Sequence, residues 1–487
     1  MARPAWMLNA APIGVVGLVA FALAKETSFR ARYAGAATHQ LMITDARVLN
    51  VRDGSVREHQ TILIDTGRIT AVLDDAQRPT RSRAFNLLDA HGRLLTPGLV
   101  DAHFHSEMLF GDSVVANGGL LTHLRQEPDS IRAYRERIAA AYLPHGITLV
   151  RDLGSAVRDF PLLKAWMMRD SSSPDFLASG AQLVSPERER VLPPFQIPVA
   201  DSAAGAAQVR AFAAAGFRNI KLYWRLREPA FQGALVEADR LGLTTTAHLD
   251  EGIVTFNRAL TLGLRHFEHA HTMAVSVMRP DEREAATRTA AALLGGGTDA
   301  LSRRGGFPVY VLEHWRTLGD HDVRILALME RLRATGSTVT PTLHVIAQRA
   351  GASTFSTPPL GIYDDVRDFT PAQRARLAED YRILARTVAR MDSIGVHLAV
   401  GSDTQEPGRS VLDELCLLRD AGIPSWRVLR IATLYSAEAV GQGREYGAIE
   451  KGRRADLVLF DDDPLRDMHA VFGPKTIVKD GIVAIRR

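Results

Sequence analysis

The chain has 487 residues, of which 46% are hydrophobic and 23% are charged. These fractions are typical of a folded globular protein with a large core, and they exclude a disordered chain and a protein with many membrane spans. The net charge is +4, and the 59 basic and 55 acidic residues are scattered along the sequence, so we expect no nucleic-acid partner. Cys416 is the only cysteine, which excludes a disulfide framework and a cysteine-based zinc or iron–sulfur site.

The first 24 residues have the pattern of a targeting segment. Arg3 precedes an apolar, uncharged stretch at 10–24 that ends in Ala22-Leu23-Ala24. This predicts a signal peptide at 1–24, followed by a polar linker at 25–39. Residues 6–24 together are long enough to span a membrane, so attachment through an uncleaved anchor is the second interpretation. We therefore expect an exported protein, periplasmic or secreted, or a membrane-anchored one; a cytoplasmic location is the least favoured.

The two flanks of the chain share one strand-like pattern. Residues 40–96 and 447–487 contain short apolar runs separated by turn sequences at 52–54, 65–67 and 480–481. We expect these flanks to form one small composite β-sandwich.

The middle of the chain, residues 97–446, alternates between short apolar runs and helical patterns of about 10–25 residues. Eight strands that alternate with helices are typical of a (β/α)8 TIM-like barrel. Long loop-like stretches before the last two strands are either functional loops or solvent-exposed insertions. The eight runs lie at 99–100, 147–150, 176–178, 219–222, 243–246, 266–267, 338–341 and 397–400.

Potential metal ligands stand at the ends of several of these runs. His103 and His105 are two residues apart on one strand, so their imidazoles point to the same side. His248, His269 and Asp403 each follow another apolar run, and in a barrel all strand ends meet at one rim. Imidazole and carboxylate ligands suit zinc, with manganese, cobalt or iron as alternatives.

Lys221 lies inside the predicted strand at 219–222 and is one of only six lysines in the chain. A buried lysine can lose its proton, and its neutral amine can add CO2 to form a carbamate that bridges two metal ions. An ordinary lysine at a strand end is the alternative. Tyr223 shares the inward face, either as a substrate contact or as packing. His271 forms a second His-x-His pair with His269, either as a substrate contact or as a loop histidine.

Several motifs together resemble the amidohydrolase superfamily. Residues 95–105 (Leu-Thr-Pro-Gly-Leu-Val-Asp-Ala-His-Phe-His) resemble its opening, and the segments 145–154, 267–269, 401–404 and 447–457 resemble later motifs. Pro341-Thr342-Leu343 resembles the imidazolonepropionase-related and metal-dependent dipeptidase (prolidase-like) branch. The resemblance covers residues 40–487.

This resemblance implies a (β/α)8 barrel that carries two divalent metal ions. His103, His105 and Asp403 would hold one ion, His248 and His269 the other, and carboxylated Lys221 would bridge them, with Asp403 as the catalytic base. Relatives of this branch carry a Gly-Gly-His after the third barrel strand, whereas this chain has Ser179-Gly180-Ala181 there. Dipeptidase specificity is therefore left open.

We accordingly expect a metal-dependent hydrolase that cleaves an amide or peptide C–N bond in a small peptide, an N-acyl amino acid or a cyclic amide. A lactonase or a deaminase on the same barrel is the alternative, and a non-catalytic, membrane-anchored binding protein is the third reading. The partner would be a small molecule or short peptide, and assembly into a homo-oligomer is left open.

Overall fold

The computed structural model describes residues 40–79, 85–109, 128–187, 192–249, 253–297, 301, 306–352 and 369–486. The predicted signal peptide or anchor and the linker lie outside these residues and stay predictions. Residues 39–487 form one compact unit. Among the described residues, no helix combines the length and the apolar character needed to cross a membrane.

The two flanks of the chain meet in one eight-stranded sheet. Strands β5 and β16 pair antiparallel, with Leu95 opposite Leu459 and Pro97 opposite Leu457, and this pair joins the N-terminal strands to the C-terminal ones. The strand order is β18-β17-β16-β5-β1-β2-β3, with β4 beside β1. The pairing describes a single sheet, so it does not establish the predicted sandwich. The strands are β1 (Gln40–Leu49), β2 (Val56–Asp65), β3 (Arg68–Asp74), β4 (Asn86–Asp89), β5 (Leu94–Pro97), β16 (Leu457–Phe460), β17 (Lys475–Lys479) and β18 (Ile482–Ile485).

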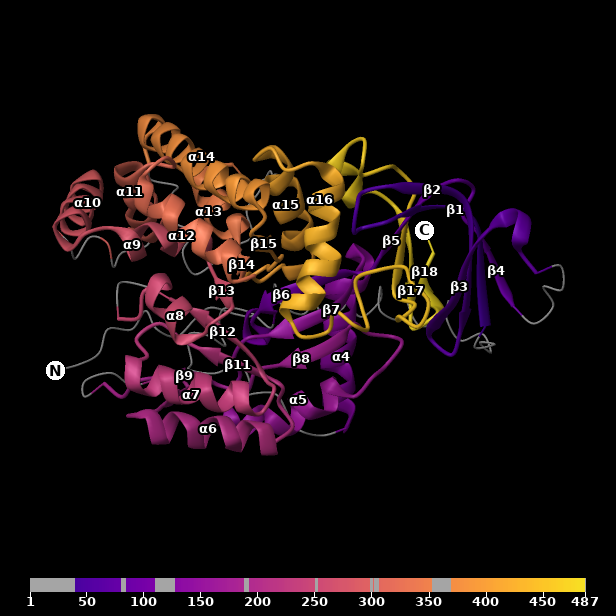
Figure 1. Ribbon diagram of the computed structural model, residues 1–487, viewed down its shortest axis with the longest axis horizontal. Helices are drawn as coiled ribbons and strands as arrows, with labels where there is room; N and C mark the ends of the chain where they lie inside the picture. Colours follow the sequence, from indigo (N-terminus) through magenta and orange to yellow (C-terminus); the bar gives the residue numbers. More distant parts are fainter. Residues whose placement is uncertain are drawn as a thin grey trace, which may run out of the picture. The chain divides into compact units, whose positions relative to one another are not determined.

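The middle of the chain is a TIM-barrel-like α/β fold. Each of the eight predicted apolar runs lies in or overlaps a strand, and every pairing between these strands is parallel. In Figure 1 the strands occupy the centre, with α6 and α7 on one side and α14 and α15 on the other. The strands are β6 (Leu99–Phe104), β7 (Ile147–Asp152), β8 (Asp175–Ala178), β9 (Gln182–Val184), β10 (Gln196–Pro198), β11 (Asn219–Leu222), β12 (Thr244–His248), β13 (His266–Glu268), β14 (Thr338–Thr340) and β15 (His397–Leu398).

The strand ladder is not one continuous ring. Strands β6-β7-β8 form one sheet, and β10-β9-β11-β12-β13-β14-β15 form another. Between the ends of β15 and β6, the backbone N–H of Ala102 donates to the carbonyl of Val400 at 2.8 Å. The ladder is also interrupted between β8 and β9. Gly180 lies there with a φ of +74°, which turns the chain out of a regular strand. The strands therefore form a barrel-like arrangement, and the closed barrel stays a prediction.

The helices connect and cover the parallel strands, because a parallel pair needs a crossover connection. Several of them carry a proline in the first turn, where its missing N–H costs no helical hydrogen bond. α14 starts at Pro371 with Thr370 and Gln373 as a capping box, and α7 starts at Glu228 with Pro229 in its first turn. The helices are α2 (Ser106–Leu109), α4 (Pro128–Tyr142), α5 (Phe160–Met167), α6 (Ser202–Ala214), α7 (Glu228–Arg240), α8 (Phe256–Leu262), α9 (Met273–Val277), α10 (Pro280–Leu293), α11 (Gly306–Leu318), α12 (Val323–Ala334), α13 (Leu343–Ala350), α14 (Pro371–Ile394), α15 (Pro407–Asp420), α16 (Ser425–Arg430) and α17 (Ser436–Ala439).

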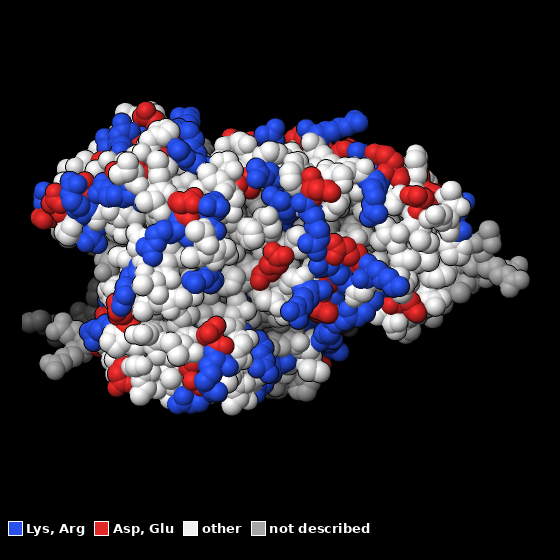
Figure 2. All heavy atoms as spheres, in the orientation of Figure 1, with Lys and Arg blue, Asp and Glu red and all other residues white. Residues whose placement is uncertain are grey.

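The charges on the surface are mixed. Figure 2 shows lysine and arginine side chains interspersed with aspartate and glutamate over the face in view, with uncharged atoms between them. This distribution follows from the nearly equal numbers of basic and acidic residues along the chain.

Candidate metal centre and active site

All six predicted metal ligands lie at the C-terminal ends of the central strands. His103 is the last but one residue of β6, and His105 directly follows that strand; Lys221 is in β11, His248 ends β12, and His269 follows β13. Asp403 Oδ1 lies 3.6 Å from both His103 Nε2 and His105 Nε2, and its Oδ2 lies 4.0 Å from His269 Nε2. The rings of His248 and His269 are 4.3 Å apart.

One close group of three ligands includes residues that the resemblance assigns to different metal ions. His103, His269 and Asp403 each offer a ligand atom, and these three atoms lie within 4.8 Å of one another. The resemblance places His103 and Asp403 on one ion and His269 on the other. Asp403 therefore lies where it could contact both parts of the ligand set.

Non-glycine residues after three successive barrel strands have a left-handed backbone at this rim. The φ angles are +64° at His269, +50° at Thr342 and +46° at Asp403, at the ends of three successive barrel strands. Such angles are uncommon outside glycine and often occur at functional sites. Backbone hydrogen bonds support two of them: His269 N donates to Thr340 O at 2.8 Å, and Asp403 N donates to His103 O at 3.0 Å. These turns direct His269 and Asp403 away from regular strand alternation.

Lys221 is fully buried, and its Nζ has no hydrogen-bond partner among the described residues. Burial lowers the pKa of this amine to about 8, although the charges of Glu268 and Asp403 oppose the change. His103 Nε2 is likewise buried without a hydrogen bond in the described part of the chain. Buried polar atoms are normally paired, so unsatisfied ligand atoms that converge on one place fit a bound metal ion.

Three histidines of the site are held in the neutral form that binds metal. Burial lowers the pKa of His105, His248 and His269 well below the usual value, and neighbouring positive groups add to the effect. They are therefore neutral at ordinary pH, as ligation requires. Burial raises the pKa of Asp403, whereas the charges of His103 and Lys221 act to lower it. The carboxyl is thus closer to accepting a proton than an exposed aspartate is.

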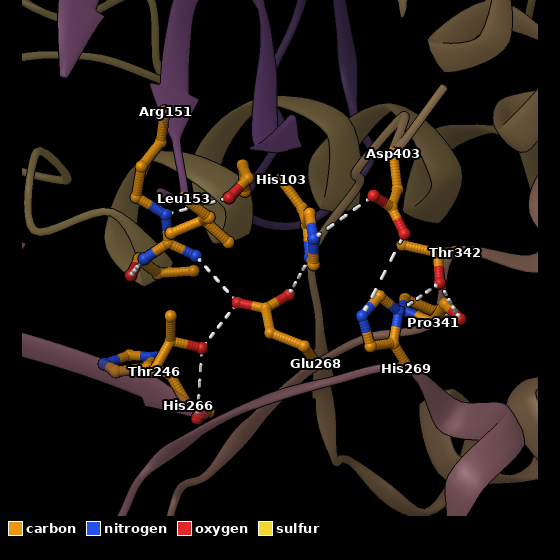
Figure 3. A network of polar contacts seen from close by, with 12 residues as sticks. His103, Arg151, Leu153, Thr246, His266, Glu268, His269, Pro341, Thr342 and Asp403 are labelled. Atoms are coloured by element: carbon orange, nitrogen blue, oxygen red, sulfur yellow. Dashed lines mark hydrogen bonds and ion pairs between the residues drawn. The ribbon is translucent and has the colours of Figure 1, made fainter. Parts of the chain in front are cut away.

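A buried acid that the sequence analysis missed, Glu268, holds His103 in place (Figure 3). Glu268 Oε2 lies 2.7 Å from His103 Nδ1, so the other ring nitrogen, Nε2, faces Asp403. Glu268 Oε1 accepts hydrogen bonds from Arg151, at 3.1 Å, and from Thr246. Simple strand alternation would put Glu268 and His269 on opposite faces. The left-handed backbone of His269 lets both reach the interior.

Tyr223 and His271 lie beside the predicted ligands. The Tyr223 ring packs edge-on against His248 at 5.2 Å, and the His271 ring lies 5.1 Å from His269. His271 is buried, with 3% of its surface exposed. Both positions are compatible with contact to a substrate at the metal site.

The loop after β9, a few residues beyond the missing Gly-Gly-His, is attached to the loop after β11. Ser185 Oγ accepts a hydrogen bond from the Arg227 backbone N–H at 2.9 Å, and Arg225 forms an ion pair with Glu187 at 2.6 Å. This contact joins the loops that follow β9 and β11 at the same rim as the ligands.

Comparison with known proteins decides the family. The sequence profile of the Amidohydrolase family matches residues 94–484. The chain belongs to the amidohydrolase family. This result confirms the resemblance seen in the sequence motifs.

Two curated proteins with similar sequences are named for different reactions. Adenine deaminase 2 of Rhizobium etli is 25% identical over 93% of this chain and 58% of its own length. Imidazolonepropionase of Shouchella clausii is 31% identical over 20% of this chain and 23% of its own length. The chain therefore spans less than two thirds of the length of either relative.

Solved structures support the same fold. Bottromycin amidohydrolase has a TM-score of 0.63 and 20% identity, over 94% of this chain and 89% of that chain. A Xaa-Pro dipeptidase with bound methionine has a TM-score of 0.60 and 17% identity, over 91% of this chain and 99% of that chain. At these identities the likeness concerns the fold alone.

Proposed function

We propose that this amidohydrolase is a metal-dependent hydrolase that cleaves an amide or peptide C–N bond. Its substrate would be a small peptide, an N-acyl amino acid or a cyclic amide. The observation that carries the proposal is the meeting of His103, His105, His269 and Asp403 at one rim, beside His248 and the buried Lys221. The scaffold we propose is a closed (β/α)8 barrel, with the flanking sheet as part of a composite sandwich.

The ligand set fits two divalent ions. His103, His105 and Asp403 would hold one ion, His248 and His269 the other, and carboxylated Lys221 would bridge them. Zinc suits these ligands, with manganese, cobalt or iron as alternatives. Such ions, when bound, lower the pKa of a coordinated water and polarise a carbonyl group.

The protein groups supply the proton transfers and the positioning. Asp403 takes a proton from the attacking water as the oxygen of this water bonds to the carbonyl carbon of the substrate. As the C–N bond breaks, Asp403 passes this proton to the leaving nitrogen, so the products are a carboxylic acid and an amine. Glu268 keeps His103 in one orientation throughout, and Tyr223 and His271 lie where the substrate would contact them.

Deamination is the second candidate function. The match to adenine deaminase 2 covers 93% of the chain, and a deaminase also breaks a C–N bond by adding water. A lactonase would use the same core on an ester. Turnover of N-acyl amino acids, lactones and aminopurines, compared in one panel, separates the three reactions.

The first experiment is the metal content of protein purified without chelators, measured by elemental mass spectrometry. We expect two equivalents per chain, and a lower value in Lys221→Ala because the bridging ligand is lost. Lys164→Ala is the matched control, since Lys164 lies exposed on α5. Asp403→Asn should lose most turnover of the amide panel.

Each other outcome changes the proposal in a defined way. One equivalent that is indifferent to Lys221→Ala would contradict the bridged site and favour a single-metal enzyme. No metal after zinc, manganese and cobalt have been offered would favour the non-catalytic reading.

A further inference from the structure

The hydroxyl group of Thr342 contacts the His269 ring on its Nδ1 side (Figure 3). The Nδ1 and Oγ1 atoms lie 2.9 Å apart, and both residues are buried. The same hydroxyl donates a hydrogen bond to the carbonyl oxygen of Pro341 at 2.8 Å. A hydroxyl has a single proton to donate, so Thr342 Oγ1 accepts a hydrogen bond from His269 Nδ1. The contact therefore favours the form of the ring that carries its proton on Nδ1.

This form leaves the other ring nitrogen, Nε2, as the one that can bind a metal ion. His269 Nε2 lies 4.0 Å from Asp403 Oδ2, and His269 belongs with His103 and Asp403 to the close group of ligand atoms. A neutral imidazole binds metal through the nitrogen that has no proton, and the hydrogen bond at the other nitrogen decides which one that is. The Thr342 hydroxyl thus selects the nitrogen of His269 that faces the predicted metal site.

Thr342 does not have the usual role of a threonine that precedes a helix. It is the residue directly before α13, where a threonine side chain commonly accepts a hydrogen bond from a backbone N–H of the first turn. Within the described part of the chain, the Thr342 side chain makes no such bond. The carboxylate of Glu414, on α15, accepts from the N–H groups of Leu343 and His344 at 2.9 and 2.6 Å. Because Glu414 caps the helix, the Thr342 hydroxyl can contact His269 instead.

The backbone supports the same contact. The φ angle of Thr342 is +50°, a conformation that a β-branched residue rarely adopts. On the neighbouring segment, the N–H of His269 donates to the carbonyl of Thr340 at 2.8 Å, and the N–H of Ala270 donates to the carbonyl of Pro341 at 3.3 Å. The two segments that carry the hydroxyl and the imidazole are therefore fixed against each other. An unusual backbone angle that the surrounding structure holds in place is typical of a functional site.

We propose that Thr342 is a positioning residue that fixes His269 as a metal ligand. It acts through His269 and not on the substrate. This inference rests on the proposed metal-dependent function, and it adds the turn after β14 to a site whose predicted ligands lie on or after β6, β11, β12, β13 and β15. The role parallels that of Glu268 beside His103, except that the partner is an uncharged hydroxyl.

The test compares Thr342→Val with Thr342→Ser. Valine has nearly the shape of threonine and is also β-branched, but it cannot accept the hydrogen bond. We expect metal affinity, measured by competition with a chelator, to fall about 10-fold in Thr342→Val. This is the lower end of the range for losing the partner of a ligating histidine, because the partner is uncharged. Thr342→Ser keeps the hydroxyl and should bind metal as wild-type protein does.

The visible absorption spectrum of cobalt-loaded protein is the second readout. The bands of Co²⁺ depend on the geometry of its ligands, so they report the orientation of His269 separately from affinity and turnover. We expect a changed spectrum in Thr342→Val and a wild-type spectrum in Thr342→Ser. Thr342→Ala removes the same hydroxyl without a β-branched side chain, and it should show the same losses if valine impairs folding.

Thr387→Val is the matched control. Thr387 is buried on α14, and its Oγ1 donates a hydrogen bond to the carbonyl of Ile383 at 2.9 Å. The variant loses the same kind of hydroxyl contact as Thr342→Val does. It should leave the metal affinity and the cobalt spectrum unchanged.

Each outcome decides the inference. Wild-type affinity and a wild-type spectrum in both Thr342→Val and Thr342→Ala would overturn it. Losses of the same size in Thr342→Val and Thr342→Ser would also overturn it, because the hydroxyl would then not be the group that matters. Wild-type protein that binds metal but cleaves no amide would overturn the proposed reaction, while the metal measurements still decide the role of Thr342. Wild-type protein that binds no metal would overturn both.

Discussion

At the scale of single residues, Glu268 decides which nitrogen of His103 faces Asp403. Its carboxylate lies 2.7 Å from His103 Nδ1 and also accepts hydrogen bonds from Arg151 and Thr246. Burial alone would raise the pKa of Glu268, but the positive charges of His103, Lys221 and Arg151 outweigh it and hold this pKa well below the usual value. Glu268 is therefore ionised, and its charge stabilises the Nδ1–H form of the ring.

Glu268→Gln should weaken metal binding about 10- to 100-fold, the usual effect of removing the hydrogen-bond partner of a ligating histidine. The amide has nearly the same shape as the acid but lacks its charge, so His103 is less firmly oriented. Affinity for zinc or manganese, measured by competition with a chelator, checks this without any turnover.

Thr246→Val is the control for this prediction. It removes one hydrogen bond to the same carboxylate and leaves the charge in place. We expect a clearly smaller effect on metal affinity. If Glu268→Gln binds metal as wild-type protein does, Glu268 does not position His103.

At the scale of elements, the start of α13 links α15 to the metal site. The carboxylate of Glu414, on α15, accepts hydrogen bonds from the backbone N–H groups of Leu343 and His344 at 2.9 and 2.6 Å. These groups are among the N–H donors that a helix leaves unsatisfied at its start. Thr342 immediately precedes them and contacts His269. Glu414 therefore holds the start of α13, directly after Thr342.

Glu414→Ala should lower the free energy of unfolding by about 2–4 kcal/mol, because two buried N–H groups lose their acceptor. Burial raises the pKa of Glu414 to about 8, although the two N–H groups oppose the change. An acid whose pKa is raised in the folded state opposes folding as it ionises. The difference in the free energy of unfolding between wild-type protein and Glu414→Ala should therefore shrink as the pH rises from about 5 to about 9. Urea unfolding at several pH values checks both expectations.

Glu379→Ala is the reference variant for this measurement. The Glu379 side chain is 65% exposed and pairs with Arg316 at the surface, so we expect a change of less than about 0.5 kcal/mol. An effect of Glu414→Ala as small as that of Glu379→Ala would show that α13 does not depend on this cap.

At the scale of the whole molecule, Lys479 connects the flanking sheet to the barrel-like part. It lies buried on β17, and its Nζ is 2.8 Å from Asp175 on β8, 3.3 Å from Asp456 and 2.9 Å from Asp480. Burial lowers the pKa of the amine, but the three carboxylates outweigh burial and raise it. Lys479 therefore stays charged at neutral pH and neutralises acids from both parts of the chain.

Lys479→Met should lower the free energy of unfolding by about 3–5 kcal/mol near pH 8, because removing one partner leaves buried charges unpaired. Burial raises the pKa of Asp456 to about 6 even beside the lysine. Without the lysine Asp456 binds a proton more readily, so the loss in the free energy of unfolding should be smaller near pH 5. Thermal unfolding at both pH values measures the difference.

Lys451→Met provides the comparison, since Lys451 is exposed and lies in the same C-terminal region. It should change the unfolding temperature little at either pH. Equal losses in Lys479→Met at both pH values would show that packing, rather than unpaired charge, determines the effect.

Features that depend on local patterns could be predicted from the amino-acid sequence. Apolar runs and turns predicted the central strands, and the motifs identified the amidohydrolase family. The spacing of His103 and His105 and the positions of His248, His269 and Asp403 at strand ends predicted which side chains meet at the rim. These signals are readable because strand periodicity and turn chemistry act over a few residues.

The partners of the buried charges could not be predicted in this way, because they come together only in the folded chain. Glu268 is 165 residues from His103, and Lys479 is 304 residues from Asp175, so no local pattern connects them. The left-handed backbone at His269, Thr342 and Asp403 breaks the alternation on which the sequence argument relied. Burial makes such long-range pairs matter, because a charge away from water must be matched by a neighbour in space.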